Sequence, residues 1–140
     1  MTVEIRRAGP GDLGLFERVA EDVFDYAVDA RVLAEYLATP LHHLVVAVAD
    51  GEVVGQVAAV VHRHPDDRPV ELYIDEVAVA PGFRRAGIAR LMLDEAFDLG
   101  RELGCAEAWV GTEHDNLPAT ALYETRGSEP EPFVMYVFKL

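Results

Sequence analysis

The sequence predicts one α/β domain in which helices cover both faces of a mixed sheet. Short Val- and Ala-rich segments with strand character alternate with segments whose apolar residues recur at helical spacing. The expected order is β-α-α-β-β-β-α-β-α-β, and no repeat or low-complexity linker interrupts it. With 140 residues the chain is long enough for one substantial core, so residues 1–140 are expected to form a single domain.

The first half of the chain is expected to contain a strand, two helices and a hairpin. Apolar residues from Leu13 to Val23 recur at helical spacing. Asp50-Gly51, between two Val/Ala-rich runs, is the strongest hairpin signal in the chain. The expected elements are a strand at 3–6, helices at 13–23 and 30–37, and strands at 44–50 and 53–61.

The second half is expected to alternate strands and helices. Pro81-Gly82 breaks a strand, and the long amphipathic helix after it ends at Gly104. Asn116 can cap the last helix, which Gly127 ends. The expected elements are strands at 71–79, 106–112 and 133–140 and helices at about 87–103 and 116–127.

Composition excludes several classes of function. The formal net charge of −13 argues against nucleic-acid binding, which depends on phosphate neutralisation, whereas an acidic surface attracts cationic partners. No run of 18 apolar residues and no signal-peptide core appear, so neither a membrane span nor secretion is expected. The single Cys105 cannot form an internal disulfide, which favours the cytoplasm. His62 and His64 lack a third ligand at metal-site spacing, so no metal is expected.

A glycine-containing turn between a strand and a helix points to an anion site, because free N–H groups and the positive helix end meet there. The dinucleotide fingerprint GxGxxG is absent. Gly82 and Gly87 have the spacing of the Walker loop, but Ile88 and Ala89 stand where Lys and Ser/Thr are required. What remains is an R-x-x-G-x-A loop at residues 84–89, with an ordinary βα turn as the alternative.

This loop resembles the pyrophosphate-binding loop of the GCN5-related N-acetyltransferases, the GNAT superfamily. A second segment, from Asn116 to Tyr123 and followed by Gly127, resembles the N-x-x-A-x-x-x-Y helix of the same superfamily. The resemblance covers most of the chain. It implies a mostly antiparallel central sheet with helices on both faces, and acetyl-CoA as the cofactor.

The resemblance also implies roles for single residues. The backbones of Val77 and Val79 would pair with the pantetheine amides like an added strand, and one N–H group could polarise the thioester carbonyl. Asn116 would contact pantetheine, and the Tyr123 hydroxyl would lie near the sulfur and protonate the leaving thiolate; otherwise Tyr123 is a core aromatic. The expected cofactor-binding residues are Val77, Val79, Arg84, Arg85, Ala86, Gly87, Ile88, Ala89, Arg90, Asn116 and Tyr123.

The acceptor amine must be neutral to react, so a base is needed. Asp75 and Glu76 are adjacent in a predicted strand, where neighbours point to opposite faces, so one carboxylate should point into the protein. It would serve the acceptor cleft or form a salt bridge with an arginine. Glu113 and His114, expected at the end of the next strand, could share this work or be solvated. The expected catalytic residues are Tyr123, Glu113, Glu76 and His114, and the expected substrate-binding residues are Asp25, Asp29, Asp75, Glu76, Glu113 and Asp115.

A closer resemblance, carried by the residues 71–93 and 118–127, is to the aminoglycoside 3-N-acetyltransferases of antibiotic resistance. It implies a polycationic acceptor, with Glu21, Asp22, Asp25 and Asp29 able to line the acceptor mouth. The alternatives are acetylation of a polyamine or a protein N-terminus, and a non-catalytic acyl-CoA sensor. The apolar final strand and the habit of the family favour a homodimer.

Overall fold

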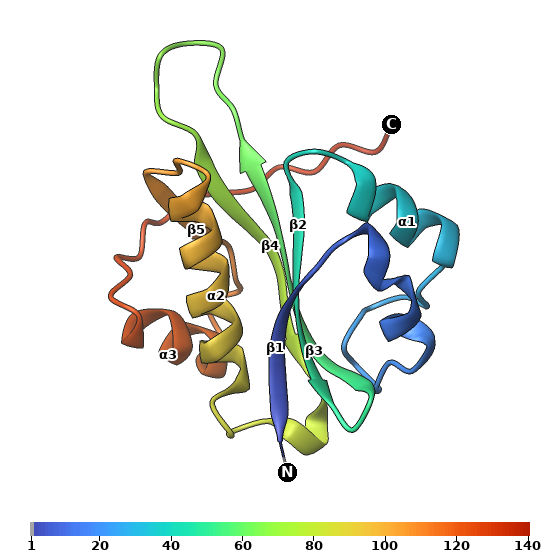
Figure 1. Cartoon of the computed structure of the whole chain (residues 1–140). Coiled ribbons are helices and arrows are strands. Elements are labelled where there is room, and N and C mark those ends of the chain that lie inside the picture. Colours follow the sequence, from blue (N-terminus) through green and yellow to red (C-terminus); the bar gives the residue numbers. More distant parts are fainter. Residues whose placement is uncertain (1) are drawn as a thin grey trace.

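The computed structural model describes residues 2–140 and contains a five-stranded sheet with the strand order β1-β2-β3-β4-β5 (Figure 1). The first four strands are antiparallel neighbours, and β5 joins β4 in parallel. The predicted mixed, mostly antiparallel sheet is therefore confirmed. The strands are Val3–Ala8 (β1), His42–Ala49 (β2), Glu52–His62 (β3), Glu71–Val79 (β4) and Glu107–Val110 (β5).

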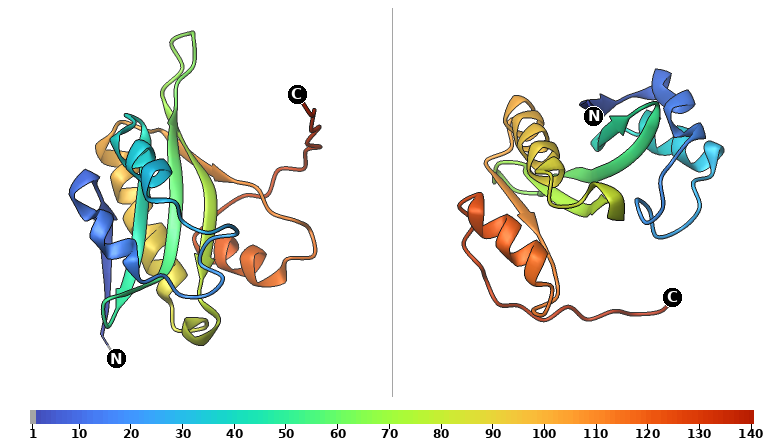
Figure 2. Two further views of the ribbon diagram at one scale, coloured as in Figure 1. Left: turned by 90° about the vertical axis from the view of Figure 1, so that its right-hand side faces the viewer. Right: turned by 90° about the horizontal axis from the view of Figure 1, so that it is seen from below.

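Helices cover both faces of this sheet, as predicted (Figure 2). A side chain at Gly55 of β3 would meet Met92, so this face of β3 lies under α2. Ala58, three residues on and hence on the opposite face, lines a cleft with residues of α1. The helices are Ala30–Ala38 (α1), Ile88–Glu102 (α2) and Leu117–Thr125 (α3), with 3₁₀ helices at Pro10–Glu17 (η1) and Pro81–Phe83 (η2).

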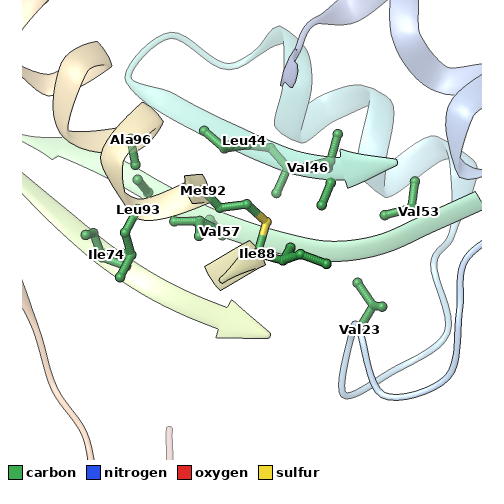
Figure 3. Packing of buried hydrophobic residues seen from close by; sticks show 14 of the residues in the cluster. Val23, Leu44, Val46, Val53, Val57, Ile74, Ile88, Met92, Leu93 and Ala96 are labelled. Atoms are coloured by element: carbon green, nitrogen blue, oxygen red, sulfur yellow. The ribbon is translucent and has the colours of Figure 1, made fainter. Parts of the chain in front are cut away.

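One part of the core lies between α2 and the sheet (Figure 3). The same buried cluster also includes Leu33 and Leu37 of α1. Met92 and Leu93 of α2 are fully buried, as are Val57 of β3 and Ile74 of β4. Burying an aliphatic side chain of this size stabilises the fold by about 1.5–3 kcal/mol. This packing fixes the start of α2 relative to the end of β4, which is where the predicted anion site lies.

One predicted helix is wrong. The chain does not remain helical from 13 to 23; η1 ends at Glu17, and Val19 then forms a parallel bridge with Val53. The Val53 N–H donates to the Arg18 carbonyl, and the Ala20 N–H donates to the Val53 carbonyl, both at 2.9 Å. The pairing of β3 with β4 ends at Gly55, so this backbone edge of β3 would otherwise lack partners. Tertiary hydrogen bonds thus override helical spacing here.

The predicted strand at 133–140 is also wrong as an element of the single chain. Residues 133–140, here called the apolar segment, have no strand partner within residues 2–140 and extend away from the sheet (Figure 2). The side chains from Phe133 to Phe138 are 69–81% exposed. The strand predicted at 106–112 is shorter than expected and covers only Glu107–Val110.

Candidate active site

The loop between β4 and α2 has a strained backbone just before the helix begins. Arg85 and Gly87 both adopt positive φ, 63° and 78° respectively, a region that only glycine enters without steric cost. The Arg84 side chain folds back, and its Nε donates to the Val79 carbonyl at 3.0 Å. These torsions turn the chain sharply, so that α2 begins directly beside the end of β4.

The first turn of α2 has the properties of an anion site. Gly87 caps the helix without a side-chain hydrogen bond, so the first N–H groups of this 15-residue helix lack a capping partner. Arg84, Arg85 and Arg90 are exposed, and none of them forms an ion pair within residues 2–140. Three guanidinium groups without an ion-pair partner and an uncapped helix start therefore coincide, which fits a pyrophosphate.

Strands β4 and β5 separate just before this loop. Their parallel pairing covers only Glu71 to Ile74 of β4, although β4 continues to Val79. The opposite edge of β4 stays paired with β3, where Val77 faces Val57 and Val79 faces Gly55. The edge of Val77 and Val79 toward β5 thus has no strand partner within the described residues and can accept an extended ligand as a strand would.

Helix α3 follows β5 after the exposed residues Glu113 to Asp115. The Asn116 side chain accepts a hydrogen bond from the Ala119 N–H at 3.2 Å, which confirms the predicted cap. Tyr123 is half-buried, and burial raises the pKa of its hydroxyl. The hydroxyl therefore carries its proton at neutral pH, although a raised pKa makes it a weaker acid than an exposed tyrosine.

A bulge in β4 explains the adjacent acidic residues. Ala58 of β3 faces Glu76 and Ala59 faces Ile74, so Asp75 is an extra residue that interrupts the alternation of the strand. Burial raises the pKa of the Tyr36 hydroxyl of α1, and the charges of Asp75 and Glu76 raise it further. Neither forms an ion pair within residues 2–140, so no salt bridge accounts for them.

Glu76 lines a cleft of about 390 Å³ between β4, β3, β2 and α1. Volumes of this size suit small-molecule ligands. Its walls are mostly apolar, with Asp25 and Asp29 beside Glu76 as acidic groups. Asp29 also caps α1, because its side chain accepts from the N–H groups of Arg31 and Val32. The full lining is Phe24, Asp25, Tyr26, Ala27, Val28, Asp29, Val32, Leu33, Tyr36, Leu44, Ala58 and Glu76.

The cleft changes the titration of the groups that line it. Burial raises the pKa of Glu76, and the charges of Asp75 and Asp25 raise it further. Burial is also the main reason why the pKa of Tyr36 rises to about 12. The Tyr36 hydroxyl donates to the His43 carbonyl at 2.7 Å, which holds α1 on β2 and fixes this wall. Glu76 is therefore a carboxylate that binds protons more readily than an exposed one.

Other predicted acceptor-site residues lie elsewhere. Glu113 and His114 do not end β5 as expected; β5 ends at Val110, and both lie with Asp115 in the exposed loop before α3. The reason is that β4 and β5 separate after four pairs, which leaves this stretch without a strand neighbour. Glu21 and Asp22 are exposed and do not line the cleft.

The sequence analysis does not identify Tyr36 of the cleft wall or an aromatic pair next to Asp75. Tyr36 lies in a predicted helix, and helical spacing does not show that its hydroxyl faces the cleft. Tyr73 and Trp109 stack with ring centroids 4.3 Å apart, and the Tyr73 hydroxyl donates to Asp75 at 3.2 Å. The signal available was the period of two in β4, which places Tyr73 on the same face as Asp75.

Comparisons with known proteins agree with this geometry. The sequence profile of the acetyltransferase (GNAT) family matches residues 14–127. A streptothricin acetyltransferase of Streptomyces lavendulae is 37% identical over 79 residues, which are 56% of this chain and 40% of that protein. The chain thus spans less than half the length of that relative. An uncharacterized N-acetyltransferase of Mycobacterium tuberculosis (strain ATCC 25618 / H37Rv) is 28% identical over 111 residues, 79% of this chain and 67% of that protein.

Solved structures share the fold at low sequence identity. An aminoglycoside acetyltransferase from an uncultured soil metagenomic sample, in complex with sisomicin, has a TM-score of 0.83 at 19% identity, and the match covers 99% of this chain and 96% of that one. The aminoglycoside acetyltransferase AAC(6')-Iy, in complex with a bisubstrate analog, has a TM-score of 0.81 at 21% identity, with coverage of 100% and 99%. At such identities these matches bear on the fold alone.

Proposed function

Because the chain belongs to the acetyltransferase (GNAT) family, we propose that it is an acetyl-CoA-dependent N-acetyltransferase for a small polycationic amine. One observation carries the proposal: β4 borders both halves of a two-substrate site. Its edge at Val77 and Val79 has no strand partner and adjoins the uncapped start of α2, and the bulge next to it directs Glu76 into an acidic cleft. A transferase needs the two substrates to meet in this way.

The residues present fit coenzyme A. The uncapped start of α2 at Gly87 and the exposed arginines without ion-pair partners suit its pyrophosphate, while the backbone of Val77 and Val79 suits the amides of its pantetheine arm. When bound, acetyl-CoA supplies the activated acetyl group. Asn116, at the start of α3, would contact the same arm, as in the family.

Three groups of the chain would then perform the transfer. Glu76 holds the cationic amine and accepts its proton, and its raised pKa makes it a stronger base than an exposed carboxylate. A backbone N–H of Val77 or Val79 stabilises negative charge on the reacting carbonyl oxygen. The Tyr123 hydroxyl donates a proton to the departing sulfur. Glu113 and His114 remain candidates for relaying the amine proton from the β5–α3 loop.

The acceptor we propose is an aminoglycoside, modified at its 3-amino group, which would make the enzyme a resistance factor. The net charge of −13 and the carboxylates of Asp25, Asp29 and Glu76 around one cleft favour a polycation. Several proteins of the same fold are named aminoglycoside acetyltransferases, and one of them is a 6'-type enzyme. The 6'-amino group is therefore the rival position.

Two other functions are weighed against this one. Another GNAT acceptor, such as a polyamine or a protein N-terminus, would use the same Glu76 and the same cofactor loop. A non-catalytic acyl-CoA sensor would need neither a hydroxyl at Tyr123 nor the carboxylate of Glu76 in the cleft, so the presence of both residues favours the enzyme. We further propose that the enzyme acts in the cytoplasm as a homodimer. Within residues 2–140, no helix combines the length and apolar character that crossing a membrane requires.

A panel assay tests the proposal. Release of free CoA from acetyl-CoA should be measured with 2-deoxystreptamine aminoglycosides that carry or lack a free 3-amino or 6'-amino group, and with polyamines and N-terminal peptides. Loss of turnover only when the 3-amino group is absent supports the assigned position, whereas dependence on the 6'-amino group moves it. Turnover only of polyamines or peptides rejects the aminoglycoside. Tight acetyl-CoA binding without turnover of any amine would leave the sensor.

A further inference from the structure

The segment from Glu21 to Val28, here called the acceptor loop, supplies one wall of the proposed acceptor cleft. Its residues from Phe24 to Val28 line this cleft in an unbroken run. Within residues 2–140, no backbone hydrogen bond joins residues 21–28 to the sheet or to a helix. The place of this wall therefore depends on how the two ends of the loop are held and on side-chain contacts along it.

Both ends of the acceptor loop are held by hydrogen bonds. Before the loop, the Ala20 N–H donates to the Val53 carbonyl of β3 at 2.9 Å. After the loop, the Asp29 side chain accepts from two N–H groups at the start of α1. The residues between these points need a third attachment if the carboxylate of Asp25 is to keep a defined place in the cleft.

Gln56 of β3 provides this third attachment. Its side-chain Nε2 donates to the Val23 carbonyl at 3.2 Å, and no other side-chain hydrogen bond or ion pair within residues 2–140 joins the sheet to the acceptor loop. Val23 itself is fully buried. Its carbonyl directly precedes Phe24, so the bond fixes the backbone at the point where the cleft-lining run begins.

The register of the sheet puts this amide beside the cleft. Gln56 and Ala58 are two residues apart in β3 and so share a face, and Ala58 lines the cleft. In β4, Gln56 faces Ala78, which lies two residues beyond Glu76. The amide thus lies next to the acceptor loop, between the cleft wall and the strand edge that we propose for the cofactor.

Stability alone does not account for an amide at this position. Gln56 is 1% exposed and is the one polar or charged residue among residues 2–140 that is buried. Its Oε1 has no hydrogen-bond partner within the same residues. An unpaired buried acceptor destabilises a fold and offsets the gain from the single bond to Val23, whereas an apolar side chain of the same length would avoid that loss. The amide is therefore best explained by the contact that it makes.

The bond at Val23 controls the position of the carboxylate two residues further on. Asp25 lines the cleft together with Glu76 and has no ion-pair partner within the described residues. Burial raises the pKa of Glu76, and the charges of Asp75 and Asp25 raise it further. A loop that left the sheet would take the charge of Asp25 away from Glu76 and from a cation bound in the cleft.

We propose that Gln56 is a positioning residue of the acceptor site, whose amide holds the acceptor loop on β3 and thereby sets the place of Asp25 in the cleft. Gln56 does not line the cleft, so it acts on the bound amine through Asp25. The effect on acetylation rests on the proposed function. The attachment of the loop does not, and it can be measured without a substrate.

An NMR titration measures the attachment in the free protein. Gln56→Met removes the donor and keeps the length of the side chain. The pKa of the Glu76 carboxyl should then fall, because the cleft opens to water and Asp25 moves away. Asp25→Asn should lower this pKa in the wild-type background but change it little beside Gln56→Met. Equal shifts in the two backgrounds would show that Gln56 does not place Asp25, which overturns the proposal.

Kinetics with an amine that the panel shows to be acetylated give a second measurement. Gln56→Met should raise the KM for the amine about tenfold, as expected for a weakened contact between an ammonium and a carboxylate, with a smaller change in kcat and in acetyl-CoA affinity. Asp25→Asn should add no further loss beside Gln56→Met, because both changes act on one contact. Additive losses contradict the proposal. If no amine is acetylated, the proposed function fails, and the titration still decides the role of Gln56.

Val61→Ala is the matched control. Val61 is a buried residue of the same strand but lies on the opposite face from Gln56, toward α2. This change should lower the Tm and leave the pKa of Glu76 and the KM for the amine unchanged. Gln56→Leu removes the same donor and takes the place of Gln56→Met if that variant folds poorly. A Gln56 variant with a lower Tm but the wild-type pKa of Glu76 and the wild-type KM would mean that the amide only supports the fold, and the proposal would be wrong.

Discussion

Asp75 and Glu76 are consecutive residues of β4, yet a bulge opposite Ala58 and Ala59 brings both carboxylates near the same tyrosine, Tyr36. A regular strand would have sent them to opposite faces. Because of the extra residue, Glu76 lines the cleft, while Asp75 next to it is exposed and does not line it. Burial destabilises the charged form of Glu76, because this side chain has no ion-pair partner within the described residues.

The first prediction concerns stability against pH. The pKa of Glu76 is raised by burial, so its contribution to stability is present below its unfolded pKa and is lost as pH rises through the folded value. Glu76→Gln should therefore raise the Tm at pH 7.5, and the gain should vanish near pH 4. Glu71→Gln is the opposite control, because the hydrogen bond from His64 lowers the pKa of Glu71, and removing that charge should lower the Tm at neutral pH. A lower Tm for Glu76→Gln at pH 7.5 contradicts the buried-carboxylate account.

The second prediction identifies the base. Glu76→Gln should lower kcat/KM for the amine by about 10²–10⁴-fold and flatten the rise of rate with pH, since the proton acceptor is removed. Glu113→Gln, made in the exposed loop, should have the smaller effect. Initial rates between pH 6 and 9 with saturating acetyl-CoA provide the comparison. If Glu113→Gln is the more damaging change, the base lies in the β5–α3 loop.

A third prediction tests the cofactor loop. Gly87→Glu should abolish acetyl-CoA binding, because it places a side chain at a residue with φ of 78° and a negative charge where the pyrophosphate binds. Gly82→Glu adds the same charge in the same turn, at a position with open space around it and an ordinary φ. Calorimetry should detect no binding for Gly87→Glu and only a modest loss for Gly82→Glu. Unchanged affinity in a folded Gly87→Glu variant would exclude the loop as the cofactor site.

The fourth prediction concerns Tyr123. Tyr123→Phe removes the hydroxyl but keeps the ring that packs against the core, so acetyl-CoA affinity and Tm should change little. The kcat should fall by about 10²–10⁴-fold, the usual contribution of a general acid. Tyr136→Phe, in the exposed apolar segment, is the control for loss of a hydroxyl. Wild-type turnover by Tyr123→Phe means that this side chain only packs.

The fifth prediction concerns salt. If the acceptor is a polycation drawn to the acidic cleft, its kcat/KM should fall as sodium chloride rises from about 10 to 300 mM, because the Debye length shrinks from about 30 Å toward a few ångströms. Asp25→Asn should reduce this dependence, since Asp25 lines the cleft. Rates that do not vary with salt would argue against electrostatic attraction of the acceptor.

Local physics made much of the molecule predictable from the sequence. The hairpin at Asp50-Gly51, the cap at Asn116 and the turn at Gly87 depend on torsions and hydrogen bonds within a few residues, and each lies where its residue type demands. The cofactor loop is predictable for the same reason: a strand, a glycine turn and a helix start are contiguous in the chain.

Only the tertiary structure decided which carboxylates meet in a cleft, because that depends on contacts between distant segments. The bulge that turns Glu76 toward Tyr36 arises from the pairing of β4 with β3, and no pattern within β4 alone reveals it. Residues 18–20 are not helical, because their backbone forms hydrogen bonds with Val53 at an edge of β3, which is distant in the sequence. The apolar segment has the sequence of a strand, but a strand exists only where an unpaired edge accepts it, and β5 of its own chain does not.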